Sequence, residues 1–333
     1  METALELIDP LFEDPPDADA MLRLCQDFGP YHQYAIEASE VALGGLPQRF
    51  DSAFNFVTTG GRLGRVEEPA TAIARTSYFR ESYAYGDRIV APGIEPFLHH
   101  PALINAARRI HGREVVVPAI AYANLLLPGQ ELAVHTDVPE FRGADRRRYP
   151  QWLMVVMLHS GLFDRWRMPI ATGISYFGEA AGGALSCWPN GAAGAVRLIE
   201  PRHNMAVVTD TDRAFHGVDR VGAADAPAPP VEAGMVMDPN RDGGWTLRQG
   251  ESPARSYGPG EVRFSVSWKA YCFADEQERE AWTNHSDDLT LDQILEALVD
   301  DLVERGQMAQ RPADDRTLAR ALVDGYVQFP ATS

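Results

Sequence analysis

His135 and Asp137 have the residue types and the spacing of two metal ligands. They end an apolar, β-branched segment that is interrupted by a turn at Pro128-Gly129, a pattern typical of two strands. On a strand, side chains at i and i+2 project from the same face, so this imidazole and this carboxylate can bind one ion. Such ligands suit a divalent ion such as Fe(II), and two histidines with one carboxylate leave positions open on the iron.

The His-x-Asp motif is weak by itself. With 9 histidines and 47 acidic residues among 333, roughly one His-x-Asp or His-x-Glu is expected by chance. A second copy begins at His285, directly before an apolar segment with helical spacing. There we expect Ser286, Asp287 or Asp288 to cap a helix, because acidic residues are favoured at a helix N-terminus. We therefore predict the metal site at His135 and not at His285.

A third ligand is expected from a later strand on the opposite side of a barrel. His216 follows an apolar strand at 205–208 and a polar turn, and it is flanked by Phe215 and Val218. Its alternative role is that of a hydrogen-bonded structural histidine. His159, which also follows an apolar segment, is the rival ligand. The other histidines lie in predicted helices or polar turns.

The segment 261–269 alternates strictly between polar and apolar side chains. One face carries Arg263, Ser265, Ser267 and Lys269, and the other carries Val262, Phe264, Val266 and Trp268. In a barrel one face of a strand points inward, and a buried arginine is costly unless an anion binds it. Arginine can hold a carboxylate through two hydrogen bonds, and Ser265 can add a donor. The alternative, for this strand alone, is a polar face exposed to solvent.

Many short strands between flanking helices are predicted to position these residues. Turn signals separate strand candidates at 115–137, 151–159, 172–178, 183–188, 204–210 and 261–273. Helical spacing and capping signals predict helices in 17–29, 93–112, 289–306 and 317–329. We therefore expect a mainly β protein with flanking helices (α+β) around a barrel or sandwich core.

Two stretches show no sustained period. We expect loops and short strands in 46–94. The Gly/Pro/Ala/Asp-rich stretch 222–260 is predicted to be a long excursion with little core of its own. Length alone suggests about two domains, but β-barrel folds with helical additions reach this size around a single core.

The order of the motifs resembles that of the 2-oxoglutarate/Fe(II)-dependent dioxygenases, nearest to their prolyl-hydroxylase-like branch. The matching features are the His-x-Asp at 135–137, the Gly-Gly pair at 182–183, His216, and the strand with Arg263 and Ser265. The resemblance implies a single oxygenase domain, 1–333, with a double-stranded β-helix core of the jelly-roll or cupin type. Its expected parts are helical and loop support in 1–114, the core in 115–275 with insertions at 138–170 and 222–260, and C-terminal helices in 276–333.

The resemblance also implies an enzyme that uses Fe(II), the cosubstrate 2-oxoglutarate and O2. Its metal ligands and catalytic centre would be His135, Asp137 and His216. The expected reaction couples oxidative decarboxylation of 2-oxoglutarate to hydroxylation, or a related C–H oxidation, of a small-molecule or amino-acid-like substrate. Asp137 stands where the family's halogenases have glycine, so hydroxylation is favoured over halogenation.

Arg263, helped by Ser265, would bind the distal carboxylate of 2-oxoglutarate. Since 47 positions separate it from His216, more than in compact relatives, Arg220 and Arg255 remain alternatives. The Arg263–Ser265 pair also separates the oxygenase from its main rival, a non-catalytic cupin-like protein that binds a metal or a small molecule and needs no carboxylate-binding group. A hydrolytic zinc enzyme is disfavoured, because no candidate base lies beside the His-x-Asp.

Composition limits the partners and the compartment. A net charge of −17 disfavours nucleic acid, and no segment approaches the roughly 18 apolar residues of a membrane span. The acidic beginning of the chain does not resemble a secretory signal, and three cysteines without a CxxC pair favour a reducing compartment. We expect a cytoplasmic protein with a small-molecule substrate. Lys269 is the only lysine, an arginine bias typical of a GC-rich bacterium.

An arginine-rich run follows the His-x-Asp and includes Arg142, Arg146, Arg147 and Arg148. It predicts either an attraction for an anionic substrate or an ordinary solvated loop. The two insertions begin next to metal-ligand candidates, so we expect both at the mouth of the pocket.

Overall fold

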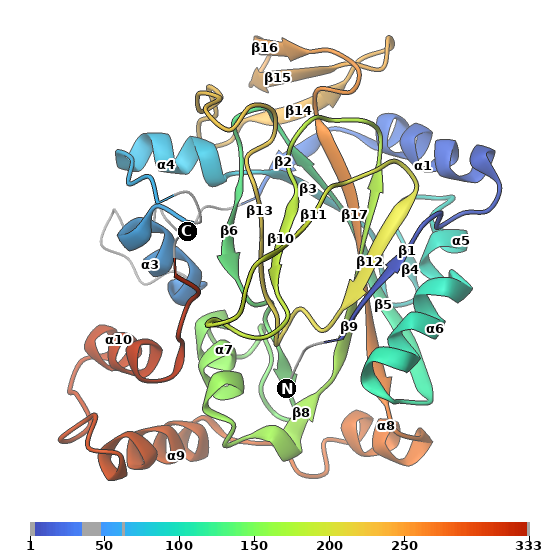
Figure 1. The fold of residues 1–333 in the computed structure, drawn as a ribbon. Helices are drawn as coiled ribbons and strands as arrows, with labels where there is room; N and C mark the ends of the chain where they lie inside the picture. The colour runs from blue at the N-terminus through green and yellow to red at the C-terminus, as the bar shows by residue number, and fades with distance from the viewer. Residues whose placement is uncertain (1–3, 35–47, 62–63, 332–333) are drawn as a thin grey trace.

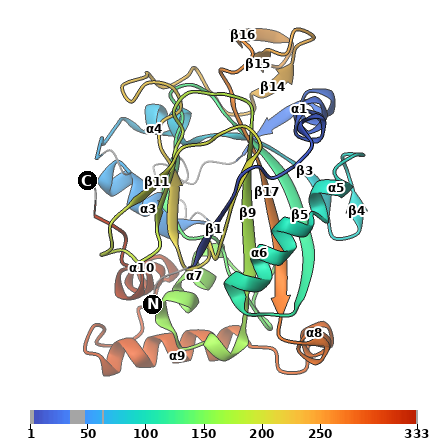
Figure 2. The same cartoon turned by 45° about the vertical axis from the view of Figure 1, so that its right-hand side comes forward.

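The fold is known from a computed structural model, which describes residues 4–34, 48–61 and 64–331 (Figure 1). Its centre is formed by two antiparallel β-sheets. Helices cover the outside of both sheets (Figures 1 and 2). The predicted fold class, mainly β with flanking helices around a jelly-roll core, is confirmed.

The major sheet has eleven strands, all paired antiparallel. Its order is β1 (Leu5–Ile8), β12 (Met205–Thr209), β9 (Ile170–Phe177), β17 (Arg263–Phe273), β5 (Val115–Leu126), β3 (Phe79–Tyr85), β2 (Tyr31–Gln33), β14 (Val236–Pro239), β15 (Trp245–Gln249) and β16 (Ser252–Tyr257), with β4 (Arg88–Ile89) beside β3. The minor sheet has the order β11 (Arg197–Ile199), β10 (Leu185–Trp188), β13 (Phe215–Val218) and β6 (Leu132–His135). The strands β7 (Glu140–Phe141) and β8 (Arg167–Met168) form a separate two-stranded sheet.

Three helices pack on the outer face of the major sheet: α1 (Pro15–Phe28), α5 (Glu95–Leu98) and α6 (Pro101–His111). The predicted helix at 93–112 is thus two helices. Pro101 begins α6, where a missing N–H costs nothing, and Gly112 ends it in the left-handed conformation. The indole N–H of Trp268 in β17 donates to the carbonyl of Leu98 over 2.7 Å and ties this layer to the sheet.

A second helical layer packs against the minor sheet. It contains α3 (Phe50–Thr59), α7 (Gln151–Ser160), α9 (Leu291–Glu304) and α10 (Asp315–Tyr326), whose apolar side chains share one core with Val134 and Phe215. The two C-terminal helices were predicted. The helix next to His285 is capped by Thr290 through a capping box, and not by Ser286, Asp287 or Asp288.

Three predicted assignments are wrong. The segment 151–159 is the helix α7, not a strand; every residue from Trp152 to Leu158 is buried, so no amphipathic period reveals the helix. The stretch 46–94 contains α3 and α4 (Pro69–Thr76) as well as strands. The stretch 222–260 contains β14–β16, which extend the major sheet and bury Met237, Trp245 and Leu247 in its core.

The remaining elements are the 3-10 helix η1 (Asp164–Trp166) and α8 (Glu276–Thr283). All three cysteines are buried and free. In the part of the chain that the structure describes, every helix is too short or too polar to cross a bilayer.

Candidate metal centre

His135 and His216 are neighbours in the minor sheet. His135 ends β6, His216 lies in β13, and the two residues are directly paired across the strands. Their flanking residues Val134 and Phe215 face the helices, so the two imidazoles face the major sheet. Asp137 follows two positions after His135, and its backbone N–H donates to the carbonyl of Thr211 over 2.8 Å.

The three side chains converge on one point. Asp137 Oδ1 lies 3.7 Å from His135 Nε2 and 3.9 Å from His216 Nε2. One ligand atom from each residue lies within 4.8 Å of the other two. This cluster, His135, Asp137 and His216, is hereafter the metal cluster.

Local hydrogen bonds set the tautomers of both histidines. His135 Nδ1 lies 2.7 Å from the carbonyl of Ala133, and His216 Nδ1 lies 3.0 Å from that of Ala214. A carbonyl accepts only, so both Nδ1 atoms carry a proton, and the Nε2 atoms are the ones that lie toward Asp137. In metal-binding histidines, one ring nitrogen binds the metal and the other donates a hydrogen bond, often to a backbone carbonyl.

The electrostatics also suit a cation. Burial, and secondarily His135, lower the pKa of His216 to about 3, so this imidazole is neutral. Burial alone would raise the pKa of Asp137, but Lys269 and the two histidines hold it well below its usual value. Asp137 Oδ2 accepts from Lys269 Nζ at 2.7 Å and from Thr211 Oγ1 at 2.5 Å, which leaves Oδ1 for the histidine side. Two imidazole nitrogens and one anionic oxygen fit Fe(II).

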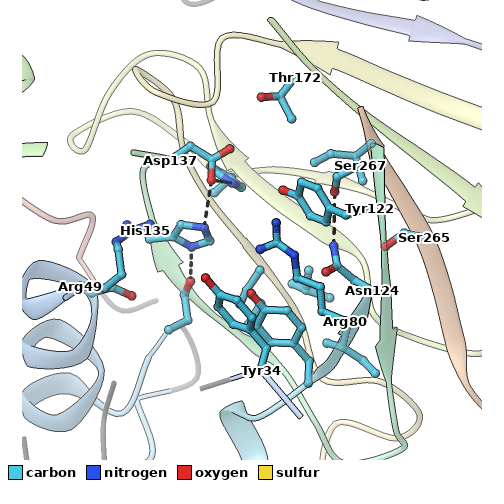
Figure 3. Close-up of a pocket in the computed structure, with 18 of the residues that line it drawn as sticks. Tyr34, Arg49, Arg80, Tyr122, Asn124, His135, Asp137, Thr172, Ser265 and Ser267 are labelled. Carbon is cyan, nitrogen blue, oxygen red and sulfur yellow. Dashed lines mark hydrogen bonds and ion pairs between the residues drawn. The ribbon is translucent and has the colours of Figure 1, made fainter. Parts of the chain in front are cut away.

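The metal cluster opens into a cavity of about 150 Å³ between the two sheets. The polar face of β17 lines it from the other side: Arg263, Ser265, Ser267 and Lys269 all contact the cavity, as the strand's alternation predicts. Figure 3 shows His135 and Asp137 on one side, with Ser265 and Ser267 facing them across the pocket. The solvated alternative for this face is wrong, because all four side chains are buried.

Arg263 has an unsatisfied hydrogen-bond donor. It is 3% exposed; its Nε donates to the carbonyl of Gly183 at 2.9 Å, and its Nη1 to Ser265 Oγ at 3.2 Å. Its Nη2 is buried without a partner, and within the described residues no carboxylate pairs with it. A buried guanidinium in this state lacks a counter-ion. Arg263, Ser265, Gly183 and Tyr176, whose ring lies near the Arg263 guanidinium, are hereafter the Arg263 site.

The Gly-Gly pair makes room for this arginine. Gly183 has φ +68°, and a Cβ there would lie 2.5 Å from Arg263 Cδ. A Cβ on Gly182 would lie 2.5 Å from the carbonyl oxygen of Gly222. Both positions therefore need glycine, for the positive φ and for the close approach.

Sequence reasoning missed one residue beside Arg263 and left a second, which lines the cavity, without a role. Tyr176 of β9 has a buried hydroxyl without a partner, and its ring lies 5.1 Å from the Arg263 guanidinium carbon. Its signal is the alternation of Thr172, Ile174 and Tyr176, all on the inner face. Lys269 had been placed on the polar face but given no role.

The rival residues lie elsewhere. His159 is buried in α7 against Phe215, and His285 is exposed and pairs with Asp288. Of the arginine alternatives, Arg220 pairs with Glu131, and Arg255 lies on the exposed strand β16. None of the four lines the cavity among the residues described.

Comparisons with known proteins gave matches among solved structures only. No family model matches the chain, and no curated protein matches it. Many solved structures that match are 2-oxoglutarate/Fe(II) oxygenases. The chain is similar to these enzymes, the family that its motif order resembles.

Three examples give the extent of the similarity. A Pseudomonas putida prolyl-4-hydroxylase is 14% identical over 81% of this chain and 93% of its own, with a TM-score of 0.38. The α-ketoglutarate-dependent epimerase SnoN is 9% identical over 81% of this chain and 79% of its own, with a TM-score of 0.42. HygX from Streptomyces hygroscopicus, with nickel, 2-oxoglutarate and hygromycin B bound, is 9% identical over 81% of this chain and 84% of its own. Its TM-score is 0.39. All three TM-scores are low, so the activities of these proteins do not transfer to this chain.

Proposed function

We propose that the protein is an Fe(II)- and 2-oxoglutarate-dependent oxygenase that hydroxylates, or otherwise oxidises a C–H bond of, a small-molecule or amino-acid-like substrate. One observation carries this proposal. A cluster suited to a divalent metal and a buried arginine without a counter-ion face the same cavity. A protein that only binds a metal does not need a buried arginine without a counter-ion.

The metal cluster would hold the iron. His135 and His216 present Nε2, while Lys269 and Thr211 orient Asp137 through its other oxygen. When bound, iron and 2-oxoglutarate together supply the oxidising chemistry, with O2 as the oxidant. The residues of this chain bind and orient the reactants and exclude water.

The Arg263 site would hold the distal carboxylate of 2-oxoglutarate. Nη2 of Arg263 is the donor without a partner, and the buried hydroxyl of Tyr176 is a second one nearby. A carboxylate is the acceptor that would satisfy such donors, through charge-assisted hydrogen bonds. Binding there supplies the missing counter-ion and so relieves the cost of burying the guanidinium.

An anaerobic titration tests the proposal. Fe(II) and 2-oxoglutarate are added to the wild-type protein, and the visible absorption of a keto acid chelated to iron is recorded. We expect a band that needs both components, and one iron per chain. A cupin-like metal binder would take up iron without developing the band when 2-oxoglutarate is added, and that result would reject the oxygenase.

A further inference from the structure

The cavity is lined by an excess of positive charge, although the chain carries a net charge of −17. Among the described lining residues, the basic ones are Arg49, Arg80, Arg146, Arg263 and Lys269, and Asp137 alone is acidic. A concave site that is partly shielded from water and lined by charges of one sign attracts ligands of the opposite charge.

Three of these cations already have carboxylate partners. Lys269 pairs with Asp137 at 2.7 Å. Arg49 pairs with Asp51 at 3.3 Å, and Arg146 with Glu140 at 4.0 Å. Within the described parts of the chain, Arg263 and Arg80 are left without a carboxylate partner. The cavity therefore has two cationic positions for ligands, and 2-oxoglutarate accounts for one.

Arg80 lies on β3, in a slot between aromatic rings. Its guanidinium carbon is 3.6 Å from the ring centre of Tyr122 and 4.9 Å from that of Tyr34. Figure 3 shows the guanidinium pointing into the pocket beside Tyr122, toward the side that carries His135. Stacking uses the flat faces of a guanidinium, and its N–H donors lie in the plane between them. Tyr78 accepts a hydrogen bond from this guanidinium, and the remaining donors suit a planar acceptor that enters the slot edge-on.

Arg80 and Arg263 occupy different parts of the cavity wall, because the Arg80 guanidinium stacks on Tyr122 and the Arg263 guanidinium lies near Tyr176. Ser265, two residues from Arg263 on β17, is paired with Asn124 of β5, and Asn124 is paired with Arg80 of β3. Two strand spacings amount to about 10 Å. Asn124 donates to Ser267 and has a buried Oδ1 without a partner, so a hydrogen-bond acceptor is also available between the two cations.

We infer that the substrate is a small carboxylate, and that Arg80 binds its carboxylate group between Tyr34 and Tyr122. This inference rests on the proposed function, in which Arg263 is occupied by 2-oxoglutarate. A carboxylate is planar and accepts two parallel hydrogen bonds from one guanidinium. The carbon skeleton next to it contacts the tyrosine rings, and a donor group on that skeleton can reach Asn124.

Binding to the loaded, non-reacting protein tests the inference. The wild-type protein is saturated with Mn(II) and 2-oxoglutarate under anaerobic conditions. Calorimetry then measures the affinities of benzoate, phenylacetate and N-acetylglycine, and of the amides benzamide, phenylacetamide and N-acetylglycinamide. Because charge-assisted hydrogen bonds are the strong ones, we expect at least one carboxylate to bind about ten- to a hundredfold more tightly than its amide.

Matched variants assign this preference to Arg80. Arg80→Gln should abolish it, and Arg80→Lys should keep part of it. The control is Arg165→Gln, because Arg165 also stacks on an aromatic ring, at 3.7 Å over Trp166, but is exposed and outside the cavity. This control variant should keep the wild-type preference for the carboxylate over its amide.

The outcomes separate the inference from the proposed function. If no carboxylate is preferred over its amide, or if Arg80→Gln keeps the preference, the inference is wrong, whereas the iron–2-oxoglutarate band remains. If Arg80→Gln loses affinity for 2-oxoglutarate instead, Arg80 holds the cosubstrate and the inference is also wrong. If the wild-type protein develops no band, the proposed function fails first.

Discussion

The metal cluster and the Arg263 site face each other across one cavity, but they are built in different ways. In the metal cluster, each histidine is oriented by the carbonyl two positions before it, and Asp137 lies two positions after His135. In the Arg263 site, the contacts join β17 to β9 and to a turn 80 positions away. The metal cluster therefore depends mainly on local sequence, and the Arg263 site on the register of the major sheet.

The largest effect is expected from breaking the metal cluster. His135→Ala, Asp137→Ala or His216→Ala should each lower metal affinity by about a hundredfold or more, since even indirect supports of a metal site contribute tenfold or more. The iron–2-oxoglutarate band should disappear in all three variants. His285→Ala, the control from the second His-x-Asp, should keep the band. Loss of the band in His285→Ala alone would contradict the assignment.

The next effect separates the two sites. Arg263→Ala should weaken 2-oxoglutarate binding about ten- to a hundredfold, the range of a charge-assisted hydrogen bond, and leave metal affinity nearly unchanged. Calorimetry with Mn(II), with and without 2-oxoglutarate, measures both quantities. Arg255→Ala, on the exposed strand β16, is the control and should change neither. If Arg255→Ala or Arg220→Ala reduces 2-oxoglutarate binding instead, the cosubstrate lies elsewhere.

A smaller effect tests whether the Arg263 site depends on a distant turn. Gly183→Ala should weaken 2-oxoglutarate binding about tenfold, because the new Cβ would meet Arg263 Cδ at 2.5 Å. It should also lower the free energy of unfolding by about 1 kcal/mol, because alanine is strained at positive φ.

Gly191→Ala is the matched control for this prediction. Gly191 has φ +78°, but a Cβ there would meet no atom within 4 Å. This variant should lose similar stability and keep its affinity for 2-oxoglutarate. Equal losses of affinity in both variants would show that the Gly183 contact does not position Arg263.

The same contrast between local and long-range structure explains which elements could be predicted. The strand β17 was predicted from its strict alternation, because one face lines the cavity and the other packs on the outer helices. The helix α7 was missed because it is buried on all sides. The strands β14–β16 were missed because their Gly/Pro-rich sequence is stabilised by pairing with β2 and each other.

The residues of the site also divide into those that form a local sequence motif and those that strand pairing places. His135 and Asp137 form a motif visible in the sequence, and the structure brings both next to His216. Tyr176 and Arg80 carry no motif. The pairing of β9, β17, β5 and β3 places Tyr176 beside Arg263 and Arg80 in the cavity wall, and the sequence alone does not specify this pairing.

The smallest effect concerns the arginine run after the His-x-Asp. The sequence left two interpretations open for this run, an attraction for an anionic substrate or a solvated loop. Of its four arginines, only Arg146 lines the cavity. Arg147 packs on Tyr85, and Arg148 pairs with Asp288.

We therefore expect Arg146→Gln to raise the KM of the substrate about two- to fivefold, the range of a partly exposed ion pair, and to leave uncoupled 2-oxoglutarate decay unchanged. The double variant Arg147→Gln/Arg148→Gln should keep the wild-type KM. Succinate release, measured with the carboxylate that stimulates it most, gives KM and kcat for each variant. A loss in the double variant equal to that in Arg146→Gln would mean that the whole run attracts the substrate through its summed charge, an effect that should then fade as salt is added.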